Sequence, residues 1–382
     1  MRILFQDHTL PQLLKDADLP VGGWAVQLRE LLIALAKAGH QSGVLTWKYA
    51  NAFVGPQSVC DLLETYDRNS GIPKLRLLTH QLPATYRQAK AFRPDIVLQS
   101  CSGMDTAIMA NVAASLQVPF VHRLACDTDA DGRHASYLSR LERWAFHYGL
   151  ARADMVICQN DYQLYAMRQR FPQKRLLLLP NAIDVTPQLL SRNRAARSYI
   201  SWLATFRYQK NLPLLYRIAS RLPHIAFKVG GALPPAPDQE SIDALAALKT
   251  LPNVELPGLI RRSGIQSFLS GSVALLSTSR YEGFSNTFLE AFAAGTPVIA
   301  CRDIDPSGII AREGLGMVAD DEEQLARRVE QLWNMRETDY AEISRRCRHH
   351  VEIHHTPSSA VHSLAKAIAS LALRQGHLSP VA

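Results

Sequence analysis

The chain has 382 residues, of which 47% are apolar and 20% are charged, a composition typical of globular proteins with two domains. No apolar run reaches the ~18 residues of a membrane span, and the N-terminal residues 1–7 have a strand pattern rather than that of a signal peptide. The net charge of +8 would suit nucleic acid, an anionic membrane or a polyanionic substrate, but no nucleic-acid-binding motif is present. The six cysteines form no C-x-x-C pair, which favours free thiols in a reducing cytoplasm.

Strands and helices alternate along the first half of the chain. Apolar runs predict strands at 2–8, 42–47, 95–99, 118–124, 155–159 and 176–179. Between the first two, Leu28, Leu31, Leu32 and Leu35 have the spacing of an amphipathic helix, which follows Gly22 and Gly23. The loop lacks the G-x-G-x-x-G pattern, so it does not predict a dinucleotide site.

Two clusters contain residue types that bind metals. Asp127, Asp129 and Asp131 precede Gly132 and faintly resemble a calcium loop, but Leu138 stands where a bidentate glutamate is required. His350 and His354 are four apart, and no third zinc ligand is evident. We therefore expect no metal at either place.

The second half repeats the alternation of strands and helices. Strands are predicted at 199–205, 225–231, 253–258 and 316–318, after a polar and basic stretch, 191–198, that we interpret as the interdomain connection. Arg207 and Lys210 lie in the loop between the first of these strands and a helix, where two cations suit a diphosphate. The last predicted helix covers 358–374.

The most informative stretch is residues 273–300. It predicts a strand from Val273, a loop containing Glu282 and Gly283, a helix capped by Ser285 or Asn286, and a new strand after Gly295 and Pro297. Ligands bind open α/β sheets where strands hand over to helices. The backbone N–H groups at the start of this helix would point toward an anion.

The sequence from Tyr281 to Ala300, YEGFSNTFLEAFAAGTPVIA, resembles the E-x7-E segment of the retaining GT-B glycosyltransferases of family 4. The resemblance implies an α/β protein with the GT-B fold: two Rossmann-like β/α/β domains with an interdomain cleft. The expected N-terminal, acceptor-side domain covers 1–185 and the nucleotide-sugar domain 186–357, with 358–382 a helix that crosses back to the first domain.

The same resemblance assigns roles to individual residues. Glu282 would contact the donor sugar and Glu290 the ribose diol, while Lys210 and Arg207 would bind the diphosphate. Asp127 is a further catalytic residue that would meet the sugar. The expected substrate-binding residues are Gly22, Gly23, Gly230, Gly258, Gly283, Phe284, Ser285, Asn286 and Thr287.

We therefore expect a retaining glycosyltransferase that moves a sugar from a UDP-, GDP- or related nucleotide-sugar to a glycan or lipid-linked acceptor, without metal or other cofactor. Polysaccharide or lipopolysaccharide assembly is the expected pathway. We expect a cytoplasmic protein, with peripheral contact to the inner face of the cell membrane as a hypothesis. An inactive nucleotide-sugar-binding protein is one alternative, because Thr205, Ala182 and Ala125 depart from the family pattern. A GT-B epimerase or phosphorylase is the alternative within the same fold, but the motifs of those enzymes differ.

Overall fold

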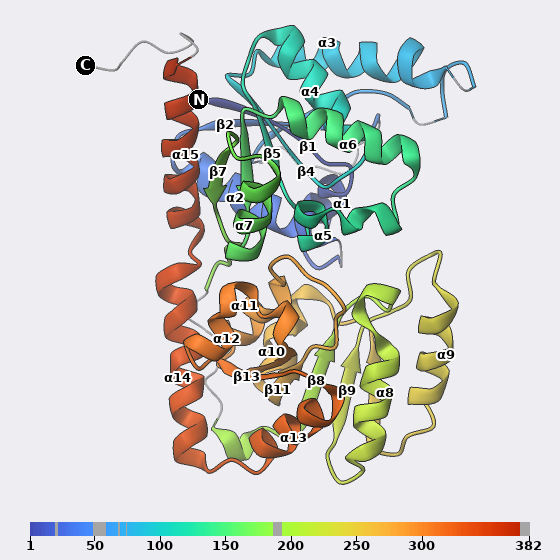
Figure 1. The fold of residues 1–382 in the computed structure, drawn as a ribbon, viewed down its shortest axis with the longest axis vertical. Helices are drawn as coiled ribbons and strands as arrows, with labels where there is room; N and C mark the ends of the chain where they lie inside the picture. Colours follow the sequence, from blue (N-terminus) through green and yellow to red (C-terminus); the bar gives the residue numbers. More distant parts are fainter. Residues whose placement is uncertain (20–21, 49–58, 68, 74, 186–192, 375–382) are drawn as a thin grey trace. The chain divides into compact units, whose positions relative to one another are not determined.

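The computed structural model describes residues 1–19, 22–48, 59–67, 69–73, 75–185 and 193–374, which form two compact units (Figure 1). The first unit combines Met1–Ala182 with Pro357–Ala382, and the second is Ile183–Thr356. The expected divisions were after residues 185 and 357, and residue 186 lies outside the described part.

The first unit is built on a seven-stranded parallel sheet with the order β3-β2-β1-β4-β5-β6-β7. Its strands are β1 (Arg2–Gln6), β2 (Gln41–Thr46), β3 (Asp61–Glu64), β4 (Ile96–Ser100), β5 (Phe120–Arg123), β6 (Met155–Cys158) and β7 (Arg175–Leu178). Alternate residues of β1 enter different apolar clusters, since Ile3 and Phe5 join one and Leu4 the other. Both faces of this sheet are therefore buried, as a parallel sheet requires.

Helices cover both faces of that sheet. They are α1 (Leu10–Lys15), α2 (Gly23–Lys37), α3 (Leu82–Phe92), α4 (Met104–Leu116), α5 (Asp127–Asp131), α6 (Arg140–Arg152), α7 (Asp161–Arg170) and α15 (Pro357–Arg374), with the π-helix η2 (Leu77–Gln81) and the 3₁₀ turn η3 (Arg133–Ser136). The leucines of the predicted helix at 28–35 lie on α2 and pack with Val361, Leu364 and Ile368 of α15. Figure 1 shows α15, in red, along the edge of this unit.

The second unit contains a six-stranded parallel sheet with the order β10-β9-β8-β11-β12-β13. Its strands are β8 (Tyr199–Leu203), β9 (Phe227–Gly230), β10 (Val254–Gly258), β11 (Ser272–Leu276), β12 (Val298–Cys301) and β13 (Gly316–Ala319). β8 lies between β9 and β11, so the chain crosses to the other half of the sheet after β10, and β8 and β11 are the neighbours at which the strand order reverses. The neighbouring pair is in parallel register, with Ser201 opposite Leu275.

The helices of the second unit surround one continuous apolar core. They are α8 (Leu212–Arg221), α9 (Gln239–Leu248), α10 (Arg262–Ser270), α11 (Asn286–Ala293), α12 (Ile309–Arg312), α13 (Glu322–Trp333) and α14 (Glu337–His354), with the 3₁₀ turns η4 (Arg194–Ala196), η5 (Tyr208–Lys210), η6 (Arg302–Ile304) and η7 (Pro306–Gly308). The predicted α/β class with two Rossmann-like sheets is confirmed. Among the helices that the structure describes, none has the length and apolar character needed to cross a bilayer.

Candidate active site

The candidate site lies at the carboxyl edge of the six-stranded sheet, where the loops after β8 and β11 meet. These strands are hydrogen-bonded neighbours at the point where the strand order reverses. Such a switch point is the usual ligand site of an open α/β sheet, because the loops from its two sides diverge there. The loop after β8 contains Lys210, and the loop after β11 contains Glu282.

The structure confirms the strand, loop, helix and strand predicted for residues 273–300. Ser285 is the N-cap residue of α11, and Gly295 follows the helix with a φ of +64° that favours glycine. Among the described residues, the Ser285 hydroxyl accepts no hydrogen bond from a backbone N–H of the first turn of α11. It lies 3.2 Å from Thr287 Oγ1. The positive end of the α11 dipole therefore points toward the edge of the sheet that carries the loops.

Lys210 and Glu282, which the sequence placed 72 positions apart, form an ion pair. Both side chains are largely buried, with 14% and 10% of their surface exposed. Gln209 supports the pair: its Nε2 donates to the Tyr281 carbonyl at 2.8 Å and lies 3.4 Å from Glu282 Oε2. A cation and a carboxylate are thus held together at the switch point, between the loops after β8 and β11.

A buried hydrogen-bond chain fixes the backbone of Lys210. The indole Nε1 of Trp202 donates to Thr278 Oγ1 at 3.0 Å, and this hydroxyl donates to the Lys210 carbonyl at 2.7 Å. Asn211, the next residue, has a φ of +55°, a conformation that asparagine tolerates better than most residues. Asn211 is the N-cap residue of α8, so the helix begins two residues after Lys210.

Glu290 lies on α11 and is half-buried. Desolvation raises the pKa of its carboxyl to about 7, and the positive charge of Arg262 partly opposes that shift. Arg262 begins α10, which packs against α11. A carboxyl in this state gains from any ligand that donates hydrogen bonds to it.

The predicted glycines Gly230 and Gly258 lie on the same edge of the sheet as Lys210 and Glu282. Gly230 and Gly258 end β9 and β10, and Gly231 N–H donates to the Gly258 carbonyl at 2.8 Å. Gly231 has a φ of +141°, and a Cβ there would lie 1.9 Å from the Ala204 carbonyl oxygen. Only glycine fits at this crossing of two loops.

The Arg207 side chain is more exposed than that of Lys210. It precedes η5, its side chain is exposed, and its carbonyl accepts the Lys210 N–H at 2.8 Å. Gly283 and Phe284 are buried beside Glu282, and the Phe284 ring lies 5.0 Å from the ring of His355. The structure thus brings Lys210 and Glu282 into contact, and leaves Arg207 at the surface of the same loop.

Three predicted residues, Gly22, Gly23 and Asp127, belong to the first unit. Gly22 is the N-cap of α2 with a φ of −58°, and no atom lies within 4 Å of a Cβ built there. The backbone of Gly22 therefore does not need glycine.

Asp127 begins α5, and its buried Oδ1 accepts hydrogen bonds from Asn160 at 2.9 Å and from Gln163 at 3.0 Å. Burial raises the pKa of the Asp127 carboxyl to about 6. Asp129, which belongs to the same acidic cluster, accepts the backbone N–H groups of Ala125 and Cys126 at the start of the helix. The acidic stretch is therefore a short capped helix and not a calcium loop. No group of three or more metal-ligand side chains occurs among the residues described.

Sequence reasoning missed Gln209, Thr278 and Arg280 as parts of the site. Their side chains and backbones link the two loops, as the contacts of Arg280 with Gln209 O at 2.8 Å and Tyr208 O at 3.1 Å illustrate. No local pattern predicts contacts between residues 70 positions apart. Only their position beside Lys210 and Glu282 could have drawn attention to them.

Two family models match the chain, one in each half. The model described as Glycosyltransferase Family 4 matches residues 21–186, and the model described as Glycosyl transferases group 1 matches residues 197–335. A search of curated proteins finds no significant match.

Solved structures with the same fold cover nearly the whole chain. Sucrose-phosphate synthase from Thermosynechococcus elongatus is 19% identical with a TM-score of 0.76, over 98% of this chain and 100% of that one. HepE of Anabaena with UDP-glucose is 16% identical with a TM-score of 0.75, over 97% and 100%. A mutant of S. aureus TarM, solved with fondaparinux, alpha-GlcNAc-glycerol and UDP, is 12% identical with a TM-score of 0.74, over 96% and 99%.

These likenesses define a protein with the GT-B fold. The matching domain models in both halves identify the chain as a glycosyltransferase.

Proposed function

We propose that this glycosyltransferase moves a sugar from a nucleoside-diphosphate-sugar to a hydroxyl group of a glycan or lipid-linked acceptor, with retention of configuration and without a metal ion. The observation that carries the proposal is the Lys210–Glu282 ion pair at the switch point of the second unit, beside the N-terminus of α11. The UDP and UDP-glucose complexes of structures with the same fold support a nucleotide-sugar donor. UDP- and GDP-sugars are the donors to test first.

In the proposed reaction, the bond between the anomeric carbon and the phosphate oxygen breaks, and its electron pair leaves with the nucleoside diphosphate. The acceptor oxygen forms the new bond, and its proton is taken up by the departing diphosphate. Negative charge therefore grows on the phosphate, where Lys210, Arg207 and the α11 N-terminus would stabilise it. Glu282 would orient the sugar and hold the Lys210 amine in place.

Glu290 would bind the ribose diol, because a desolvated carboxylate gains from accepting two hydroxyl donors. The backbone around Gly230 and Gly258 would face the base, and Gly283 to Thr287 would lie along the sugar and phosphates. In the first unit, Asp127 is proposed to meet the sugar, and the loop at Gly22 and Gly23 to border the acceptor. Neither unit carries a cofactor in this proposal.

The test is release of free nucleoside diphosphate from UDP-, GDP-, ADP- and dTDP-sugars, with and without EDTA. We expect one donor to turn over equally in both conditions. Glu290→Ala should raise the donor KM about 10- to 100-fold, since a charge-assisted hydrogen bond contributes about 1.5 to 3 kcal/mol. Lys210→Ala should lower kcat about 10²-fold, the loss typical of one transition-state donor.

The outcomes separate the alternatives. Tight nucleotide binding without turnover, even with added acceptor glycans, would favour the inactive binding protein. Loss of activity in EDTA that Mg²⁺ restores would contradict the metal-free mechanism. A product whose anomeric configuration is inverted, seen by NMR, would contradict retention.

We further propose that the protein works in polysaccharide or lipopolysaccharide assembly at the cytoplasmic side of the cell membrane, in peripheral contact with anionic lipid. Helix α6 supports the contact, because Leu141 and Trp144 are 61% and 59% exposed on its outer face. The Tyr148 ring stacks on Trp144 with centroids 5.3 Å apart, and the guanidinium of Arg152 lies 3.7 Å from the Tyr148 ring. Amphipathic aromatic rings with adjacent cations suit the headgroup region of a bilayer.

Trp144→Ala should weaken binding to anionic vesicles about tenfold, because burial of one large apolar side chain contributes about 1.5 to 3 kcal/mol. The assay is co-sedimentation with vesicles of acidic and of zwitterionic lipid, across a salt series. Ile353→Ala removes a similarly exposed apolar side chain from α14 in the second unit and is the control. Equal binding by both variants, or binding by wild type that salt leaves unchanged, would contradict this contact.

A further inference from the structure

The turn that contains Lys210 accepts several hydrogen bonds from one residue of the loop after β11, Arg280. We call residues 208–211 the lysine turn. Arg280, in the loop after β11, donates from Nη1 to the Tyr208 carbonyl at 3.1 Å and from Nη2 to Asn211 Oδ1 at 3.2 Å. Its backbone N–H donates to the Gln209 carbonyl at 2.8 Å. The guanidinium of Arg280 therefore spans the turn from its first residue to its last.

The backbone carbonyls of Tyr208, Gln209 and Lys210 all accept hydrogen bonds from the loop after β11, and that of Asn211 accepts the Leu214 N–H at 3.1 Å at the start of α8. Arg280 donates to the carbonyls of Tyr208 and Gln209, and the Thr278 hydroxyl donates to the Lys210 carbonyl at 2.7 Å. A short 3₁₀ turn has poor internal hydrogen-bond geometry, so external donors determine which conformation it holds. The Lys210 side chain leaves the backbone at the centre of this bonded segment.

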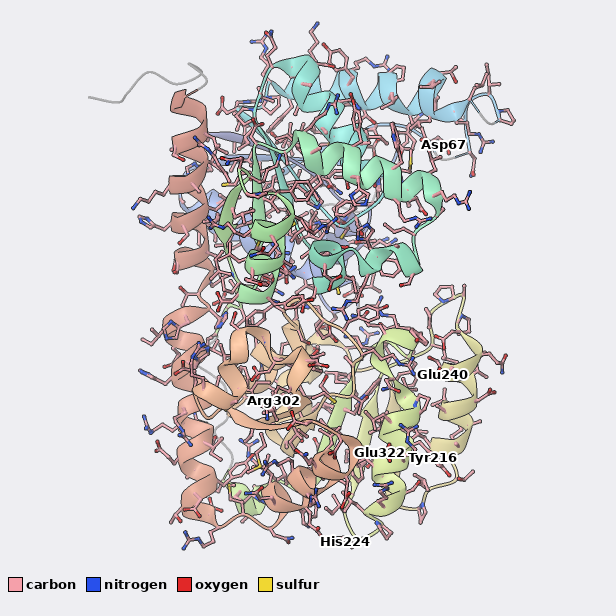
Figure 2. All side chains as sticks on the ribbon, in the orientation of Figure 1. Asp67, Tyr216, His224, Glu240, Arg302 and Glu322 are labelled. Atoms are coloured by element: carbon pink, nitrogen blue, oxygen red, sulfur yellow. The ribbon has the colours of Figure 1, made fainter. Side chains whose placement is uncertain are left out.

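The Arg280 guanidinium is also held by Glu240 and by the Tyr208 ring. Its Nη2 donates to Glu240 Oε1 at 2.5 Å, and its guanidinium lies 3.9 Å from the Tyr208 ring centroid. Glu240, labelled in Figure 2, is in the first turn of α9, and the N-cap of that helix, Asp238, accepts the Tyr208 N–H at 2.7 Å. Arg280 thus ties the lysine turn to both the β11 loop and α9.

We propose that Arg280 is a positioning residue that holds the lysine turn so that the Lys210 amine stays against Glu282. The proposal rests on the proposed function, in which this amine stabilises the departing diphosphate. Arg280 acts through Lys210 and is not assigned a contact with substrate. Lysine cannot replace it, because one ammonium group cannot donate at once to the Tyr208 carbonyl, Asn211 and Glu240 in a planar fork.

Loss of Arg280 should leave the fold intact. Its side chain is 26% exposed and its partner Glu240 is 40% exposed, and ion pairs in such positions contribute little to stability. Arg217 offers a matched control, since it is a half-exposed arginine on α8 that pairs with Glu322, also labelled in Figure 2. Arg280→Gln and Arg217→Gln should therefore have similar melting temperatures.

The first experiment measures how accessible the Lys210 amine is, without any substrate. Purified full-length protein is treated briefly with an amine-acylating reagent, and the extent of modification at Lys210 and at the exposed Lys249 is read by mass spectrometry. In wild type, Lys210 should react much more slowly than Lys249. Arg280→Gln should raise the Lys210 rate several-fold toward that of Glu282→Gln, while Arg217→Gln leaves it unchanged.

The second experiment is a double-mutant cycle on donor turnover. A displacement of about 1 Å at a catalytic group can cost about 10²-fold in rate, so Arg280→Gln and Arg280→Lys should each lower kcat by one to two orders of magnitude. The loss should disappear when Lys210 is already alanine, because Arg280 then has no group to position. Arg217→Gln should keep the wild-type kcat.

The results separate failure of this proposal from failure of the proposed function. Unchanged Lys210 acylation in Arg280→Gln, or rate losses that are additive with Lys210→Ala, would overturn the positioning role. Restoration of kcat by Arg280→Lys would mean that Arg280 acts as a charge on the substrate. If wild type turns over no donor, the proposed function fails, and the acylation rates alone decide whether Arg280 holds the turn.

Discussion

Glu290 changes charge near neutral pH in the free enzyme. Desolvation raises the pKa of its carboxyl to about 7, above the ordinary value of 4.5. Folding is therefore favoured by the neutral form, and this contribution to stability is lost as pH rises through about 7. Binding of a ribose diol, the role proposed for Glu290, has the opposite requirement, because two hydroxyl groups donate best to the ionised carboxylate.

Nucleotide affinity should consequently fall as pH decreases from 8 to 6. The decrease from Glu290 is at most about tenfold per pH unit, the limit for linkage to one proton. Isothermal titration with a nucleoside diphosphate would measure it, and Glu290→Gln corrects for titration of the phosphate itself. A pH dependence that is the same in Glu290→Gln would exclude Glu290 from the nucleotide site.

Substitution of Asp127 should change the stability and the activity of the protein in opposite directions. The pKa of its buried carboxyl is raised from 3.8 to about 6, so the stabilising neutral form is lost as pH rises through 6. Asp127→Asn keeps an oxygen for the Asn160 and Gln163 amides. At pH 8 it should stabilise the protein by about 1 to 3 kcal/mol, because two pKa units correspond to about 2.7 kcal/mol.

Urea unfolding at pH 4.5 and pH 8 would measure this difference, with the exposed Asp161→Asn on α7 as control. The gain should be clearly larger at pH 8 than at pH 4.5, because it grows as pH rises from 3.8 to about 6. If Asp127 also contacts the donor sugar, kcat falls while stability rises. A destabilised variant at pH 8 would mean that the ionised carboxylate is needed to hold α5.

At the scale of elements, α11 is anchored at its C-terminus by Arg197. This arginine is only 2% exposed and donates to the carbonyls of Ala294 and Gly295 at 3.1 and 3.2 Å and to Thr296 Oγ1 at 2.7 Å. A cation at a helix C-terminus stabilises the last carbonyls of the helix. The helix that carries Glu290 is therefore held from the end opposite the site.

Arg197→Met should destabilise the protein by about 3 kcal/mol or more, since each buried acceptor left without a donor costs about 1 to 3 kcal/mol. The urea midpoint would measure the loss, and Arg221→Met, at the exposed end of α8, is the control. Nucleotide affinity should fall in the same variant, because α11 loses its anchor. A midpoint equal to that of the control would contradict the anchoring role.

The comparison of sequence with structure is clearest at this scale. Apolar runs and helix caps predicted β11, α11 and β12, because those signals are local. The basic stretch 191–198 was interpreted as a linker, and residues 191–192 lie outside the described residues. Arg197 of that stretch is in fact buried, with acceptors about 75 and 100 positions away. Likewise, Lys210 and Glu282 were each predicted, but their ion pair depends on how two distant loops fold.

At the scale of the whole molecule, the first unit depends on a helix from the other end of the chain. Val361, Leu364, Ile368 and Leu371 of α15 are all at most 4% exposed and belong to the same apolar cluster as α2. Burial of four such side chains contributes about 6 to 12 kcal/mol in total. That amount is comparable to the entire stability of a typical domain, about 5 to 15 kcal/mol.

Truncation after Thr356 should therefore prevent stable folding of residues 1–182 while sparing the second unit. Limited proteolysis with mass spectrometry would detect it as rapid cleavage within 1–182 and persistence of fragments from 183–356. Removal of residues 375–382 alone is the control. Equal protease resistance of 1–182 in the two truncated proteins would show that α15 is dispensable.

The position of α15 also has a consequence for synthesis on the ribosome, where domains usually fold from the N-terminus onward. Residues 1–182 emerge first, yet the part of their apolar cluster that packs on α15 stays uncovered until residues 361–371 have been translated. The second unit is continuous in sequence and can complete its core earlier. The part of the protein that is made first is thus the last to complete its apolar core.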